Sequence, residues 1–290
     1  MTIKELFRSD PTRQLEEVQK VNARGRAETD VAEFYETESA KRVLTELGEV
    51  IQTHPGEAAR FLYLHATFGS GKTHLLKLIG LVADSESEFT HLGDELAQQW
   101  PGFDNLSRSI EESHVDRLKP VFLNLLDRDA SKEPPLPFLI FEAIGRELGY
   151  PTDPNWLLEW AWTVDMEFDG VWDALIAAEQ GGQTFEDVLE ERASLRRWLY
   201  ETLPSLPETT GTDLDRKSDV KASIERAEKE VDPESFDPGE LVDRVEAVTD
   251  ALNESGPQTE LLLGLDEVAL FVGDSRHRYR EFEETMEALQ

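Results

Sequence analysis

The sequence predicts an α/β fold, with a parallel β-sheet core that is interrupted by an inserted helical subdomain. Short apolar stretches suit buried strands, amphipathic stretches lie between them, and a long central region has no strand signal. The chain has 290 residues, of which 39% are hydrophobic. That is enough for one large core or for two smaller ones.

Strands and helices alternate through the N-terminal half of the chain. Apolar residues at helical spacing predict a helix over 37–52, and the apolar stretch 61–65 (FLYLH) predicts a buried strand. A second helix is predicted from Lys72 onward, a third over about 104–118, and a second strand over 121–126 (VFLNLL). This alternation is typical of a parallel sheet built from β–α–β units.

The central region carries helical patterns and no convincing strand. Helices are predicted over 137–148, from Asp153-Pro154, and from Thr184, with Asp187 in the capping position. Five of the six tryptophans fall in this region. We interpret them as packing aromatics in a small separate core rather than as a ligand-binding cage. They are Trp156, Trp160, Trp162, Trp172 and Trp198.

The predicted organisation has four segments. Residues 201–237 are acidic, contain prolines and hold few large apolar side chains, which predicts a linker or mobile excursion with room for one solvated helix. A helix then starts at Asp237-Pro238, and Leu261–Leu265 form a third buried strand. The segments are an N-terminal segment with its helix (1–55), the first part of the sheet core (56–133), the inserted helical subdomain (134–255) and the last strand and helix of the core (256–290).

The charge balance is strongly acidic. Sixty-one acidic residues against 29 basic ones give a net charge of −32, spread along the whole chain. Such a charge repels itself unless salt screens it, so we expect a solvated surface suited to high salt, as in halophiles. The charge is also a weak argument against non-specific DNA binding by this chain alone. The sequence has no cysteine, no apolar run of membrane-spanning length and a charged N-terminus, which favours a cytoplasmic protein.

A glycine-rich stretch between the first strand and the second helix matches the phosphate-loop pattern G-x-x-x-x-G-K-[ST], except that an alanine replaces the first glycine. The buried strand before it and the amphipathic helix after it are the context that this motif requires. We therefore expect a nucleotide site rather than an incidental turn, in a P-loop NTPase core. The expected nucleotide contacts are Ala66, Gly69, Ser70, Gly71, Lys72, Thr73 and His74.

Each position of this loop has a physical role. Gly69 and Gly71 can take positive φ and turn backbone N–H groups toward a phosphate, beside the positive end of the helix. Lys72 would reach the β- and γ-phosphates, and the Thr73 hydroxyl would ligate Mg²⁺. His74 can pack near the nucleotide or face solvent.

Two carboxylates, Asp266 and Glu267, follow the third strand directly. A carboxylate at a strand tip beside the loop can hold the Mg²⁺ shell, and the next one can polarise an attacking water as general base. An acidic turn after a core strand is the plain alternative in so acidic a chain. Together with the loop, the pair favours catalysis of ATP hydrolysis by Glu267 and Lys72, with Thr73 and Asp266 as the metal ligands.

The stretch 275–280 (SRHRYR) is the densest basic cluster of the chain. It can contact a polyanion or the phosphates of a neighbouring subunit. The interpretation that we favour is pairing with Glu281, Glu283 and Glu284 on the same helix.

The chain resembles the N-terminal part of the large P-loop ATPases of BREX-type phage-defence systems, the BrxC/PglY group. The similar stretches are IKELFRSDPTRQLEEVQKV near the start, FGSGKTHLLKLIG at the loop and LDEVALFVGD after the third strand. The resemblance implies an AAA+-like ATPase that uses ATP and Mg²⁺ within a multi-subunit or self-assembled complex, on or near DNA. It also implies that Lys72, Thr73, Asp266 and Glu267 carry the site.

Two departures from that family leave alternatives open. Ala66 replaces a glycine, and only 24 residues follow Asp266 (290 − 266), with no sensor strand or arginine finger among them. We therefore expect either part of a longer protein or a short relative that requires a partner for turnover. The alternatives to an ATPase of a defence complex are a nucleotide-binding regulatory module without hydrolysis of its own, and an ATPase of the initiator or loader type. Lys72 and Asp266 lie 194 residues apart (266 − 72), which the inserted subdomain explains.

Overall fold

The computed structural model describes residues 26–52, 62, 71–84, 89–113, 115–125, 133–191, 194–230, 232–254 and 257–290. Within these ranges the chain has a mixed α/β structure, mostly helical, with one parallel pair of strands. It divides into two compact units. The first contains Met1–Glu133 and Val242–Gln290, and the second contains Pro134–Leu241.

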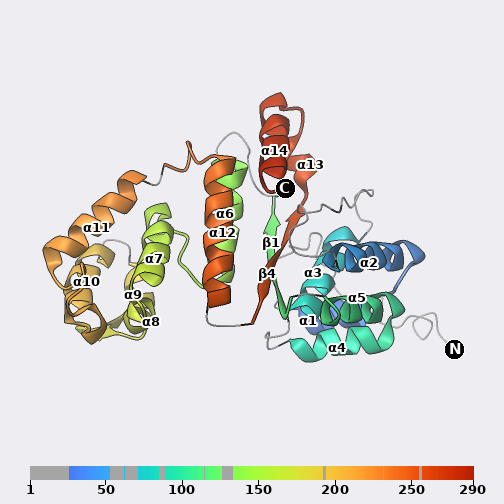
Figure 1. Cartoon of the computed structure of the whole chain (residues 1–290), viewed down its shortest axis with the longest axis horizontal. Coiled ribbons are helices and arrows are strands. Elements are labelled where there is room, and N and C mark those ends of the chain that lie inside the picture. Colours follow the sequence, from blue (N-terminus) through green and yellow to red (C-terminus); the bar gives the residue numbers. More distant parts are fainter. Residues whose placement is uncertain are drawn as a thin grey trace, which may run out of the picture. The chain divides into compact units, whose positions relative to one another are not determined.

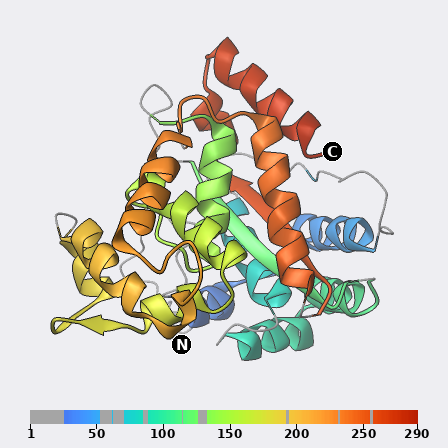
Figure 2. The same ribbon diagram turned by 60° about the vertical axis from the view of Figure 1, so that its left-hand side comes forward.

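The first unit is built on two parallel strands, β1 (Arg117–Asn124) and β4 (Thr259–Asp266). They lie side by side in Figures 1 and 2, and their register runs from Arg117 opposite Thr259 to Asn124 opposite Asp266. The predicted parallel arrangement of these two strands is confirmed. Both begin earlier than the apolar stretches indicate. The predicted strand over 61–65 lies outside the described residues except for Leu62.

Five helices lie together on one side of this strand pair (Figure 1). They are α1 (Ala27–Glu33), α2 (Glu38–Ile51), α3 (Lys72–Ala83), α4 (Thr90–Gln99) and α5 (Pro101–Glu111). The helix predicted over 37–52 is α2, which Thr37 caps by accepting a hydrogen bond from the Ala40 amide. The patterns did not predict α1 and α4.

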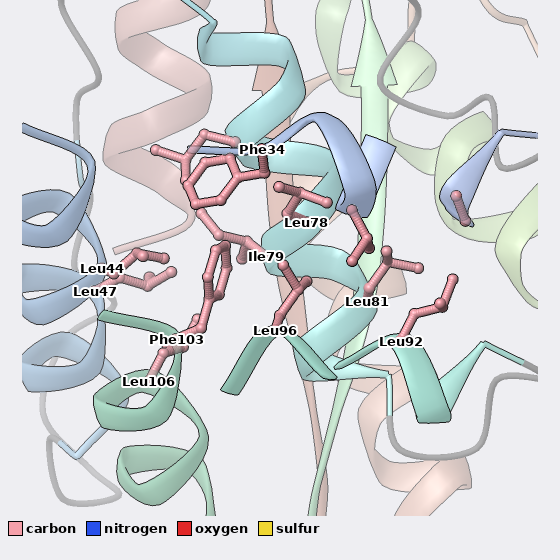
Figure 3. Close-up of a cluster of buried hydrophobic side chains, with 13 residues drawn as sticks. Phe34, Leu44, Leu47, Leu78, Ile79, Leu81, Leu92, Leu96, Phe103 and Leu106 are labelled. Atoms are coloured by element: carbon pink, nitrogen blue, oxygen red, sulfur yellow. The ribbon is translucent and has the colours of Figure 1, made fainter. Parts of the chain in front are cut away.

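The five helices share one apolar core, part of which Figure 3 shows. Phe34, Leu78, Leu96 and Phe103 are among its buried members, so the core joins the C-terminal end of α1 to α3, α4 and α5. Partly buried residues of α2, such as Val43, pack against it. The helix that begins at Lys72 is therefore anchored along its length by apolar contacts.

The helix predicted over 104–118 is shorter and begins earlier. It starts at Pro101, a residue that favours the first helical turn, and ends at Glu111. The Ser113 hydroxyl then donates to the Ile110 carbonyl at 2.7 Å, and the amides of Asp116 and Arg117 both donate to the Gln258 carbonyl. These bonds start the pairing with β4, which is why Leu118 belongs to a strand and not to the helix.

The C-terminal helices of the chain are α12 (Pro238–Glu254), α13 (Val268–Val272) and α14 (Arg276–Ala288). The predicted helix start at Asp237-Pro238 is confirmed. The Asp237 carboxylate accepts from the amides of Gly239 (2.7 Å) and Glu240 (3.0 Å), and the Glu240 carboxylate accepts from the Asp237 amide in return. This reciprocal arrangement satisfies amides that the first turn of a helix leaves without partners.

The second unit is mainly helical. Its elements are α6 (Leu136–Glu147), α7 (Asn155–Glu167), α8 (Val171–Ile176), β2 (Glu179–Gln180), β3 (Gln183–Thr184), α9 (Phe185–Glu190), α10 (Leu195–Thr202), two 3₁₀ turns (Leu203–Ser205 and Pro207–Thr209) and α11 (Lys217–Glu230). Four of its tryptophans are buried, and Trp156 is half-buried beneath the Arg196 guanidinium. The interpretation of these aromatics as core residues agrees with this arrangement.

The stretch 201–237, predicted as a linker with room for one solvated helix, does contain one helix, α11, but that helix is packed rather than solvated. Helix α11 buries Val220, Ile224 and Ala227 and lies beside α7, where the Trp160 indole N–H donates to the Ser223 hydroxyl at 3.2 Å. Apolar residues are few here, but their spacing places them on one face of the helix. Overall composition indicated a linker, whereas the positions of these few residues determine a packed helix.

Candidate functional site

The first turn of α3 begins where the phosphate-loop motif places it. Gly71 precedes the helix with φ 85° and ψ 15°, and Lys72 is the first helical residue. A residue with a Cβ rarely adopts this backbone conformation, so the position favours glycine. Gly71, the residue at the N-cap, has no side chain with which to cap the helix. The first amides of an α-helix have no partner within the helix and carry positive partial charge, which favours an anion at this end of α3.

Thr73 and Asp266 meet although they lie 193 residues apart in sequence. The Thr73 hydroxyl donates a hydrogen bond to Asp266 Oδ2 at 2.7 Å. Asp266 is the last residue of β4 and is 3% exposed. The structure thus brings together the two residues that the sequence assigns to a metal.

Asn124 is a polar neighbour of this pair that the sequence reasoning missed. It ends β1 directly opposite Asp266, and the next amide, that of Leu125, donates to the Asp266 carbonyl at 3.1 Å. The signal was present in the sequence, because an asparagine interrupts the apolar stretch VFLNLL. Parallel strands present their carboxyl ends at the same edge of a sheet, which is where Asn124 and Asp266 lie.

Glu267 follows Asp266 in a conformation that is unusual for a residue with a side chain. Its φ of 61° and ψ of 30° are left-handed, and it is the one non-glycine residue with positive φ in the described part of the chain. Its carbonyl accepts from the amides of Leu270 and Phe271, which begins the short helix α13. Strain of this kind costs about 1–3 kcal/mol and often accompanies functional sites.

His74 is directed toward α1 rather than toward solvent. Its Nε2 lies 2.7 Å from the backbone oxygen of Asp30, so Nε2 carries the proton and donates. Phe34 packs edge-on against the imidazole, with ring centroids 5.8 Å apart. One turn further along α3, the Lys77 ammonium pairs with the Asp30 carboxylate at 3.1 Å.

The remaining predicted loop residues, Ala66, Gly69 and Ser70, lie outside the described residues. Across the ranges given above, no group of three or more His, Cys, Asp or Glu side chains could hold a metal ion. Mg²⁺ bound beside phosphates usually takes only one or two ligands from the protein, with phosphate and water supplying the rest. The Thr73 hydroxyl and the Asp266 carboxylate are hard oxygen ligands at a suitable separation for that role.

The basic cluster 275–280 is partly neutralised by its own helix, as the favoured interpretation predicts. Arg278 pairs with Glu281 at 2.9 Å and also donates to the Glu133 carbonyl, and Arg280 pairs with Glu284 at 2.7 Å. Arg276 and His277 are exposed.

No family model, no curated protein and no solved structure matches this chain. None of the helices that the structure describes combines the length and the apolar character needed to cross a membrane.

Proposed function

We propose that the chain binds ATP with Mg²⁺ at the carboxyl ends of β1 and β4 and hydrolyses it, as a P-loop ATPase of the AAA+ or ASCE type. The observation that carries the proposal is the 2.7 Å hydrogen bond between Thr73 and Asp266. It joins the end of the phosphate-loop motif to the strand-end carboxylate, residues that are remote in sequence. An incidental glycine turn gives no reason for these two side chains to meet.

The side chains at this edge supply complementary groups for a triphosphate. Lys72 provides a cation at the start of α3, and the N-terminal end of the helix adds positive partial charge beside it. Bound Mg²⁺ neutralises phosphate charge in such sites, and Thr73 and Asp266 would hold it here.

Glu267 is the residue that we assign as general base. Glu267 follows Asp266 directly in the chain, and its left-handed backbone constrains the direction in which its side chain leaves the strand. A carboxylate in this place can take the proton of a water that attacks the terminal phosphate.

The test compares binding and turnover in three proteins. We expect Glu267→Gln to keep a melting temperature that rises with Mg-ATP but to lose turnover by about two orders of magnitude or more. Lys72→Ala should lose both the thermal shift and the turnover, because it removes the cation that binds the phosphates.

Asp274→Asn is the matched control for the charge change, since Asp274 is an exposed acid near Glu267 that the site does not use. It should retain wild-type turnover. Equal rates for wild type and Glu267→Gln would contradict the assignment of the base. A melting temperature that Mg-ATP leaves unchanged in molar salt would contradict the nucleotide site altogether.

We further propose that this ATPase serves an anti-phage complex of the BREX type, with other subunits or further copies as partners and with DNA contacted through the complex. The support for this step is the resemblance of the three stretches given above. Deleting the gene from a host that carries such a system should abolish phage resistance, and restoring it with Lys72→Ala should fail to recover resistance.

A further inference from the structure

Three contacts join helix α1 to the first two turns of α3. The Asp30 carboxylate pairs with Lys77, the Asp30 carbonyl accepts from His74, and Phe34 packs against the His74 ring. Phe34 belongs to the same apolar cluster as Leu78 and Ile79 of α3, as Figure 3 shows. These contacts fix the position of α1 along α3.

The hydrogen bond from His74 is accepted by the Asp30 carbonyl, near the end of α1. The Phe34 amide donates to the Val31 carbonyl at 3.3 Å, so the end of α1 tightens and the Asp30 carbonyl is not used by the Phe34 amide. His74 therefore donates to one of the carbonyls in the last turn of α1. The neighbouring residue, Thr73, makes the hydrogen bond to Asp266.

The ion pair is deeply buried, with the side chains of Lys77 and Asp30 only 9% and 3% exposed. A buried pair of this kind gains little net stability, because removing both charges from water offsets most of their attraction. Two apolar side chains would stabilise the same contact as well or better. What the charged pair adds is geometric: one carboxylate oxygen must meet one ammonium.

We propose that Asp30 is a positioning residue for the nucleotide site. It sets the rotation of the first two turns of α3 through Lys77 and His74, and thereby the directions in which Lys72 and Thr73 point. The inference rests on the proposed function, since a positioning role requires a nucleotide to be bound there. Asp30 acts on the site through its contacts with His74 and Lys77.

The test uses Asp30→Asn, Lys77→Met and the double variant, in the full chain, with Mg-ATP as the probe. Each single change leaves a charge or a polar group buried without its partner, so both should lower the melting temperature. The double variant should recover part of that loss, because no buried charge remains although the asparagine amide is still buried. Its affinity for Mg-ATP or its turnover should nevertheless stay about 10–100-fold below wild type, the usual effect of losing a residue that orients a ligand.

Leu47→Ala is the control for loss of stability alone. Leu47 is a buried residue of α2 in the same unit, outside α1 and α3. This variant should lower the melting temperature and leave nucleotide affinity unchanged. A double variant that binds and turns over Mg-ATP as wild type does would overturn the positioning role while leaving the proposed function intact. A wild-type protein that does not respond to Mg-ATP would overturn both.

Discussion

At the scale of single residues, the structure departs most from ordinary backbone geometry at Glu267. We expect Glu267→Gly to raise the free energy of unfolding by about 0.5–1 kcal/mol, because glycine adopts φ 61° without steric strain. Glu267→Gln keeps the Cβ and should leave stability unchanged, although both variants lose the proposed base. Urea unfolding of the two variants would measure the difference. If the glycine variant were no more stable than the glutamine variant, Glu267 would not be strained.

A second residue-scale feature is the position of Phe122 between two glycines. A Cβ added at Gly264 would lie 2.2 Å from Phe122 Cδ1, and one added at Gly80 would lie 2.4 Å from Phe122 Cε2. The ring thus fills the space between β4 and α3. We expect Gly264→Ala to destabilise the protein by about 1–3 kcal/mol, measured by chemical unfolding, because the crowded ring has to move.

Phe122→Leu tests whether the loss of stability in Gly264→Ala comes from crowding of the Phe122 ring. In the Gly264→Ala background the smaller side chain should restore part of the lost stability, giving a coupling energy of about 1 kcal/mol in the double-mutant cycle. Strictly additive effects would mean that the alanine is accommodated elsewhere. Phe122 and Gly264 each precede the strand end by two residues, so this packing also helps to align Asn124 with Asp266.

At the scale of elements, the sequence predicted those parts of the fold whose signals are local. The start of α3 at Lys72 and the start of α12 after Asp237 depend on a glycine or a capping carboxylate that is visible in the sequence. The parallel pairing of β1 and β4 was also predicted. Helix α1 was missed because it has seven residues and few apolar ones, and because its position depends on contacts with α3 rather than on its own pattern.

The residues of the candidate site also differ in whether a local sequence signal identifies them. The motif gave Lys72 and Thr73, and the strand end gave Asp266, because spacing along the chain defines them. Asp30 could not be found from the sequence, since it lies 44 residues before His74 and no motif relates the two. Asn124 was recognisable in principle as a polar residue that ends an apolar strand.

In the second unit, Tyr150 connects the end of α6 to α7. Its hydroxyl donates to the Asp165 carboxylate, and burial together with this bond raises the pKa of Tyr150 well above its ordinary value. Above pH about 10 the unfolded chain releases this proton while the folded chain retains it. The free energy of unfolding should therefore fall as pH rises through that range, by up to about 1.4 kcal/mol per pH unit for this group.

Tyr150→Phe isolates this contribution. At pH 7 it should lose about 1–2 kcal/mol, because the hydrogen bond to Asp165 is removed. Between pH 10 and 11 its stability should decline less steeply than that of wild type, as measured by chemical unfolding at each pH. Parallel pH curves for the two proteins would show that Tyr150 keeps an ordinary pKa in the folded state.

At the scale of the whole molecule, the net charge of −32 controls how stability depends on salt. We expect the melting temperature to rise with NaCl, most steeply below about 0.5 M, because the Debye length shortens from roughly 10 Å at 0.1 M to 3 Å at 1 M. Salt also weakens exposed pairs such as Arg280–Glu284, but such pairs contribute little. Self-repulsion is therefore the larger effect, and its screening should dominate the measurement.

A variant with fewer charges separates screening from a general effect of salt on apolar burial. Replacing four exposed acids (Glu49, Glu111, Glu283 and Glu287) by glutamine changes the net charge from −32 to −28. Because repulsion scales with the square of the charge, the steep part of the salt dependence should fall by about a quarter. The gradual rise at higher salt reflects stronger apolar burial and should be the same in both proteins. Identical curves over the whole range would rule out self-repulsion as the cause.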